Sequence, residues 1–427
     1  MVTSPKKNYH SVIIKILCIL FLLRITSDLP VAFKQVGWVT YTFPISLTKV
    51  FTFVLIGYQI LLVSLALKRV SRRIFNNLFV LVIFLMFSTA LSIISFSEVG
   101  MQVTGTINVL FRYLMEIILF LFTYKYINKE TDLIIIKNYL LIPLIYIIIT
   151  TSFFQILTDS YYNIQGVDRL VGPFSNPNVL APFINLCIFL AIIYLRKKLI
   201  SKSTYILLGL LFFLLFVTGS LTSIIGLVIF VFILFMYLKL YKNKIFYVSA
   251  PLIIVSLVLF ISKNWESIIH RISIVFNPST FELSSASSVS WRIMAWSHYL
   301  DLIENIPQLI FGFGIGFQRF IFLNGIEGNL SYIFEAPGTH NDYLAILIDF
   351  GLLGFIFFIY FLILLFNSIN NYLNDRGLIY IIKAFIFSYI IIMIMDNYLD
   401  GLITWVFFFF LFSIINVNRS KRYSNEK

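Results

Sequence analysis

Four basic side chains could act together on a phosphorylated substrate. Arg169, Arg292 and Arg319 lie in polar connections between long apolar runs, and His340 lies where the longest connection meets the next apolar run. Arginine presents paired N–H donors that fit phosphate oxygens, and several converging arginines can hold a diphosphate. A histidine, with an unperturbed pKa of about 6.5, can accept a proton from an attacking sugar hydroxyl. These residue types therefore fit the binding of a diphosphate and the activation of a hydroxyl group.

Each of these side chains also has a simpler interpretation. An isolated arginine at a membrane surface can contact lipid headgroups, and His340 can serve as a polar anchor at the interface. The general base could instead be one of the carboxylates of the same connection, among which Asp342 is close to His340. These carboxylates are Glu282, Glu304, Glu327, Glu335 and Asp342.

The elements that must position these residues are membrane-spanning helices. The chain of 427 residues is 60% hydrophobic and 12% charged, whereas soluble domains are about 45–50% apolar and about 25% charged. A span needs about 20 apolar residues, and its backbone groups must be satisfied within the segment, which favours helices. Such runs recur along the chain and predict an all-α integral membrane protein with about 12 transmembrane helices. We expect spans at residues 11–29, 44–67, 76–97, 106–127, 133–157, 178–195, 203–219, 221–238, 245–262, 340–366, 378–396 and 401–417.

Basic clusters predict which side of the membrane each connection faces. The net charge of +13 resides in short clusters between apolar runs, a pattern that argues against nucleic acid as a partner. The clusters lie near residues 6–7, 68–73, 125–129, 196–202, 239–244, 376 and 419–422. By the positive-inside rule this side, with both termini, is cytoplasmic. The longest connection, residues 263–339, is then external, and a connection of that size usually carries function.

The long external connection has its own predicted elements. Ser290 can cap a helix in which Trp296, Leu300 and Ile303 recur at helical spacing, so an amphipathic helix should lie along the outer membrane surface. Pro307 is expected to end that helix. Residues 312–316, Gly-Phe-Gly-Ile-Gly, are predicted to form a flexible turn where the backbone can approach a ligand or the membrane.

The segment that begins at His340 predicts a helix with a small-residue face. At 100° per residue, Gly351 and Gly354 fall on the same face as His340, so a neighbour could pack closely beneath the histidine. Asp349 falls on the opposite face and should meet a different neighbour.

Three segments resemble the O-antigen ligase and polymerase superfamily, which transfers glycans from undecaprenyl diphosphate. In residues 340–354, His-Asn is followed after nine residues by Gly-x-x-Gly, which is similar to the family's signature. Residues 169–178, with Arg-x-x-Gly and then Asn-Pro-Asn, resemble the element that opens its conserved membrane region. Residues 218–222 resemble an outer hairpin that often reads Thr-x-Ser-Arg. Leu221 stands where that arginine would be, which puts a phosphate role for this turn in doubt.

The resemblance implies a GT-C-like membrane glycosyltransferase that inverts the anomeric carbon without a metal. Arg169 and Arg292 would hold the diphosphate and His340 would activate or orient the acceptor, which makes these three the catalytic candidates. The implied substrate-binding set is Arg169, Arg292, Arg319, Asn178 and Asn341. Since the sequence holds no Asp-x-Asp pair and no histidine pair at metal-ligand spacing, we predict no metal and no other cofactor.

The resemblance leaves more than one function open. The first is polymerisation of undecaprenyl-diphosphate-linked repeat units into capsular or O-antigen polysaccharide at the outer face of the bacterial plasma membrane. The second is ligation of the finished glycan to lipid A-core or another acceptor, and the third, from another class, is transport of a lipid-linked oligosaccharide or a solute. Expected partners are the lipid-linked glycans, the bilayer, a flippase and a chain-length regulator. The expected divisions are N-terminal helices in 1–162, a catalytic core in 163–366 and C-terminal helices with a basic tail in 367–427.

Overall fold

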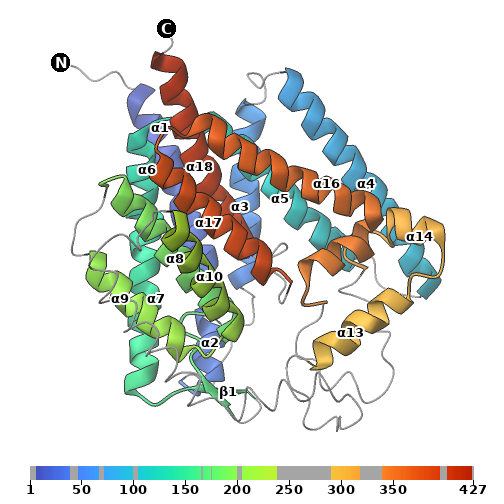
Figure 1. Ribbon diagram of the computed structural model, residues 1–427, viewed down its shortest axis with the longest axis horizontal. Helices are drawn as coiled ribbons and strands as arrows, with labels where there is room; N and C mark the ends of the chain where they lie inside the picture. The colour runs from blue at the N-terminus through green and yellow to red at the C-terminus, as the bar shows by residue number, and fades with distance from the viewer. Residues whose placement is uncertain are drawn as a thin grey trace.

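Helices and one short β-hairpin form the part of the chain that the structure describes (Figure 1). The structure, a computed structural model, describes residues 6–38, 47–66, 72–99, 104–164, 167–174, 176–199, 204–237, 290–317, 339–394 and 402–425. The helices before the hairpin are α1 (Lys6–Thr26), α2 (Leu29–Gln35), α3 (Leu47–Ala66), α4 (Arg72–Val99), α5 (Thr104–Tyr126), α6 (Glu130–Ile136), the π-helical turn η2 (Lys137–Leu141) and α7 (Ile142–Leu157). The hairpin pairs β1 (Tyr162–Ile164) with β2 (Val167–Arg169) in antiparallel register. The helices after it are α8 (Pro177–Arg196), α9 (Thr204–Val217), α10 (Leu221–Tyr237), α13 (Ser290–Asp301), α14 (Ile306–Phe311), α16 (Asp342–Tyr372), α17 (Arg376–Ile392) and α18 (Leu402–Asn425).

The predicted spans coincide with these helices wherever the structure describes them. Eleven of the twelve fall on a helix or on consecutive helical segments, and the remaining one, 245–262, lies outside the described residues. Four helical stretches are long and apolar enough to cross a membrane: Glu130–Leu157, Pro177–Arg196, Asp342–Tyr372 and Ile403–Ser420. The chain is therefore a multi-pass α-helical membrane protein, whereas the count of 12 spans stays a prediction.

The two ends of the helical assembly carry different parts of the chain (Figure 1). Both termini lie at one end, and β1 and α13 lie at the opposite end. Arg169, the last residue of β2, and Arg292, in the first turn of α13, therefore belong to the same end. That this end faces the outside remains the prediction made from the basic clusters.

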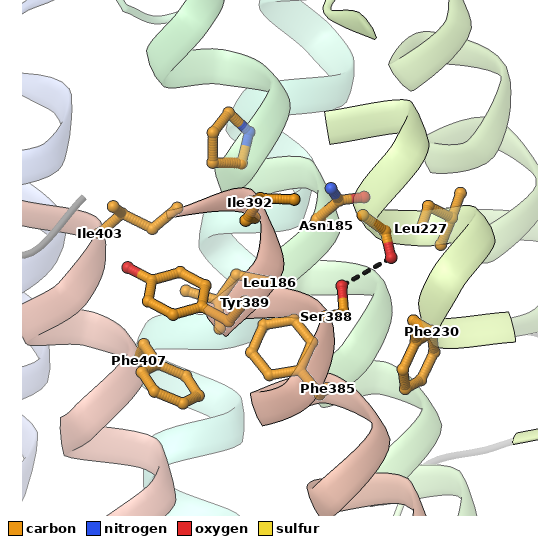
Figure 2. A pocket seen from close by; sticks show the side chains of 12 residues that line it. Asn185, Leu186, Leu227, Phe230, Phe385, Ser388, Tyr389, Ile392, Ile403 and Phe407 are labelled. Atoms are coloured by element: carbon orange, nitrogen blue, oxygen red, sulfur yellow. Dashed lines mark hydrogen bonds between the residues drawn. The ribbon is translucent and has the colours of Figure 1, made fainter. Parts of the chain in front are cut away.

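Polar side chains join the helices α8, α10 and α17 around a small cavity (Figure 2). The Asn185 amide donates to the Ser223 carbonyl at 2.8 Å. The Ser388 hydroxyl donates to the Gly226 carbonyl at 2.6 Å, the bond dashed in Figure 2. Such bonds stabilise helix pairs where no water can satisfy the backbone. The cavity between them measures about 20 Å³, which suits a single water molecule. It is too small for a sugar.

The glycine-rich residues 312–316 do not form the flexible turn that the sequence predicts. The Phe313 and Gly314 amides donate to carbonyls of α16, those of Ile348 and Asp349, at 2.9 Å each. On the other side, the Ser92 hydroxyl of α4 donates to the Ile315 carbonyl at 3.0 Å. The segment is therefore held between two helices of the protein.

The helix boundaries around this segment also differ from expectation. The amphipathic helix is present as α13, but it ends at Asp301, before the predicted Ile303. Pro307 does not end a helix; it lies in the first turn of α14, whose N-cap is Asn305. A proline suits the first turn because its missing N–H has no intrahelical partner there.

Replacing Gly314 by alanine is expected to destabilise the folded protein by more than about 3 kcal/mol. Gly314 has φ +102°, and a methyl group there would meet the backbone nitrogen and Cα of Ser92, which cannot move aside as a flexible side chain could. The matched control is Gly209→Ala in α9, where a methyl group meets nothing within 4 Å. That change should alter stability by no more than about 1 kcal/mol. Thermal unfolding of the purified variants in detergent measures both, and equal midpoints would contradict the close packing.

Candidate active site

Arg169 links the β-hairpin to two other segments that the sequence analysis singled out. Its Nε donates to the Thr218 carbonyl at 3.2 Å, and its Nη2 donates to the Asn178 amide oxygen at 3.1 Å. Thr218 precedes Gly219 in the turn between α9 and α10, and Asn178 lies in the first turn of α8. Three segments that are separate in the sequence therefore meet at one guanidinium group.

The turn between α9 and α10 contacts the Arg169 guanidinium group, although the turn itself contains no arginine. Leu221 occupies the position where the family often has arginine. The turn instead offers a backbone carbonyl, that of Thr218, and the fully buried Thr218 side chain donates in turn to the Leu215 carbonyl at 2.7 Å. The turn therefore orients Arg169.

Gln155 of α7 holds the loop that follows Arg169. Its amide oxygen accepts from the backbone nitrogens of Val171 at 3.2 Å and Gly172 at 3.0 Å, and its amide nitrogen donates to the Gly172 carbonyl at 3.3 Å. Sequence reasoning missed this residue. A polar side chain inside an otherwise apolar span was the available signal, because such residues are costly in a membrane and usually have a role.

Asn178 and Asn341, both predicted to bind substrate, have structural partners. The Asn178 side chain accepts from Arg169, so it orients the guanidinium group. Asn341 is the N-cap of α16, and its side chain accepts from the backbone nitrogens of Tyr343 at 3.0 Å and Leu344 at 3.1 Å. Asn178 therefore positions Arg169, and Asn341 caps the helix that follows His340, whereas direct contact of either asparagine with substrate remains a prediction.

His340 lies just before α16, in a backbone conformation that few residues adopt. Its φ is +48°, and its side chain is 8% exposed. The expectation that His340, Gly351 and Gly354 share one helix face is wrong for two reasons. The helix begins only after Asn341, and Gly351, with φ +65° and ψ −168°, interrupts the helix. A left-handed non-glycine residue costs about 1–3 kcal/mol and is typical of functional sites, where the surrounding structure maintains it.

Helix α13 brings Arg292 to the His340 segment. The indole nitrogen of Trp296 donates to the carbonyl of Thr339, the residue before His340, at 2.7 Å. Arg292 lies one turn before Trp296 on the same helix face, and it is only 8% exposed. Because arginine is mostly exposed in folded proteins, this burial argues against a merely solvated role.

An apolar cluster fixes the contact between α13 and α16. It consists of Tyr299, Phe313, Phe317, Leu344 and Ile348, with Trp296 packed against it. Tyr299 is fully buried, and its burial, together with the negative charge of Asp349, raises the pKa of its phenol. The cluster keeps α13 against the first turns of α16, so Arg292 and His340 belong to one local structure.

The structure describes all but one of the predicted site residues, and those that it describes form two groups. One group contains Arg169 and Asn178, and the other contains Arg292, His340 and Asn341. The labelled elements β1 and α13 lie at the same end of the assembly (Figure 1), and the convergence of the two groups on one substrate stays a prediction. Arg319 lies outside the described residues. Within the described ranges, no group of three or more histidine, cysteine, aspartate or glutamate side chains is arranged to hold a metal ion.

Comparison with known proteins agrees with the motifs. A family model described as O-antigen ligase matches residues 205–359. The match supports the O-antigen ligase/polymerase superfamily for this region of the chain. The predicted superfamily is thereby confirmed, and its members are glycosyl-transferring enzymes. The matched region includes Arg292, His340 and both glycines of the signature, whereas Arg169 and Asn178 precede it. A search of curated proteins finds no match.

Proposed function

We propose that the protein is a membrane glycosyltransferase that polymerises undecaprenyl-diphosphate-linked oligosaccharide repeat units at the outer face of the bacterial plasma membrane. The observation that carries this proposal is the burial of Arg292 on α13, the helix whose Trp296 contacts the residue before the strained His340, within the family-matched region. A diphosphate needs such a cation, and an acceptor hydroxyl needs such a base. Residues 163–366 would form the catalytic core, between the N-terminal helices 1–162 and the C-terminal segment 367–427.

The proposed reaction is a single displacement at the anomeric carbon. The acceptor sugar hydroxyl attacks that carbon, its proton passes to the His340 imidazole, and the bond to the diphosphate oxygen breaks. The undecaprenyl diphosphate leaves with the bonding electrons, and Arg169 and Arg292 stabilise its growing negative charge. Attack opposite the leaving group inverts the anomeric configuration. Since two guanidinium groups can neutralise the diphosphate, the reaction in this proposal needs no metal.

Transfer of the finished glycan to another acceptor is the second candidate. The description of the matching family as O-antigen ligase favours it specifically. The acceptor could then be lipid A-core or another surface component. Transport is the weaker candidate, because members of the matched superfamily transfer glycosyl groups. A flippase and a chain-length regulator of the same pathway are the proposed protein partners.

The purified protein in liposomes, supplied with an undecaprenyl-diphosphate-linked repeat unit alone, is expected to produce a ladder of lengthened lipid-linked glycans. Addition of a chelator should leave the rate within about twofold, because the arginines neutralise the diphosphate. Gel electrophoresis of labelled products measures both results. If products form only after lipid A-core is added, and no ladder appears, the protein is a ligase. Absence of transfer to either acceptor would contradict the proposed activity, and strong inhibition by the chelator would contradict its metal independence.

A further inference from the structure

Asp349 is a buried carboxylate that the proposed reaction does not use. It lies in α16, is 1% exposed, and contacts the glycine-rich residues 312–316 twice. Its side-chain oxygen Oδ2 accepts from the Gly316 backbone nitrogen at 2.7 Å, and its carbonyl accepts from the Gly314 backbone nitrogen at 2.9 Å. Asp349 of α16 thus binds both ends of the stretch 314–316.

The interruption of α16 at Gly351 explains why the backbone around Asp349 can accept these bonds. In a regular helix the carbonyls of Ile348 and Asp349 would accept from residues four positions later. The non-helical dihedral angles of Gly351 break that pattern. The two carbonyls accept instead from the Phe313 and Gly314 nitrogens. The break in the helix therefore creates the acceptors that the glycine-rich segment needs, since buried backbone groups must be paired.

The two backbones are in direct contact at this point. A methyl group on Gly312 would lie 2.6 Å from the Gly351 nitrogen, and a methyl group on Gly351 would meet the Ile310 carbonyl oxygen. Both residues have positive φ, so glycine is required for conformation as well as for space. The glycine-rich segment can therefore dock on α16 in one position only.

This docking determines where α13 lies. Phe313 within the glycine-rich segment and Phe317 directly after it pack with the buried Tyr299 of α13. The raised pKa of the Tyr299 phenol has the charge of Asp349 as its second cause, so the two side chains lie within electrostatic range. Arg292 lies two turns before Tyr299 on the same face of α13. A continuous series of contacts therefore connects Asp349 to α13, the helix that carries Arg292.

We infer that Asp349 is a positioning residue that anchors the glycine-rich segment and, through Tyr299 and α13, holds Arg292 beside His340. The hydrogen bond to Gly316 supplies the anchor, so an acceptor atom is required at this position. The expected effect of Asp349 on turnover rests on the proposed function, whereas the anchoring itself can be measured without any substrate.

Hydrogen–deuterium exchange of the full-length protein in detergent tests the anchoring. In Asp349→Ala, the peptide containing residues 313–317 should exchange at least about tenfold faster than in wild type, because Gly316 loses its acceptor. Asp349→Asn keeps a carbonyl oxygen at the same place and should exchange within about threefold of wild type. Asp375→Ala is the matched control. It removes an aspartate that is exposed and pairs with Arg196 at 2.9 Å, and it should leave this peptide unchanged. Unchanged exchange in Asp349→Ala would overturn the inference whether or not the protein transfers glycans.

Turnover by double variants tests the connection to Arg292. Asp349→Ala should lower kcat at least about tenfold, and Asp349→Asn should restore it to within about threefold of wild type. In the Arg292→Ala background, Asp349→Ala should lower kcat by less than about a further twofold, because its effect passes through Arg292. Independent, multiplicative losses in the double variant would contradict the inference. A loss of kcat in Asp349→Asn as large as that in Arg292→Ala would also contradict the inference. This second test applies even if Asp349→Ala does not fold.

Discussion

Replacement of His340 by alanine is expected to lower kcat for glycan transfer by about 100-fold to 10,000-fold, the usual contribution of a general base. The variant has no group to accept the proton of the acceptor hydroxyl. Binding of the lipid-linked donor should change little, because the arginines that hold the diphosphate remain. Single-turnover measurements in liposomes at saturating donor separate the two effects.

The strained backbone of His340 calls for a second variant. His340→Asn removes the imidazole but suits the positive φ, since asparagine enters the left-handed region more readily than most residues. It should be as inactive as His340→Ala while unfolding at the wild-type temperature or above. The matched control is His10→Ala, near the end that carries the termini, where His10 lies 3.1 Å from Asp132. Near-normal transfer by His340→Asn would exclude the proposed base, and Asp342→Asn would then test the alternative carboxylate.

Replacement of Arg169 by alanine is expected to lower kcat/KM by about 100-fold to 1,000-fold, comparable to the loss of one preorganised donor at a developing negative charge. Arg169 is held by the Thr218 carbonyl and by Asn178, so its guanidinium group is oriented before substrate arrives. Arg169→Lys keeps the charge but cannot make both contacts with a single ammonium group, so it should recover only part of the activity. Kinetics at varied donor concentration measure these effects.

Asn178→Ala provides the graded control for this prediction. It removes one of the two partners of Arg169 and leaves the charge in place. We expect a loss of about tenfold, smaller than that of Arg169→Ala, because the Thr218 carbonyl still holds Nε. If Arg169→Ala transferred glycans at the wild-type rate, Arg169 would have no role at the diphosphate and the lipid-headgroup interpretation would stand.

Hydropathy was sufficient to predict the helices because a membrane span must be long, apolar and internally hydrogen-bonded. Where the structure describes them, the predicted spans coincide with helices, including α8 and α16. The motif segments were also predictable, because residue type and order are properties of the sequence. Which side faces outward, and how many spans there are, remain predictions from the basic clusters.

Local backbone geometry was less predictable. The periodicity argument placed His340 on a helix face with Gly351, but the N-cap at Asn341 and the break at Gly351 remove both residues from a regular helix. The glycine-rich segment resembled a flexible turn because glycine permits many conformations, and only its contacts with α4 and α16 select one. Long-range contacts, not local propensity, decided these conformations.

The sequence alone determined the membrane class of this protein, its superfamily and the basic residues that its chemistry would need. Only the tertiary structure decided that Arg169 is held by Asn178 and Thr218, that Trp296 brings α13 to the residue before His340, and that Asp349 anchors the glycine-rich segment. The physical reason is the nature of the partners. Many of them are backbone carbonyls and amides, which every residue has, so no residue type reveals in advance which of them will meet.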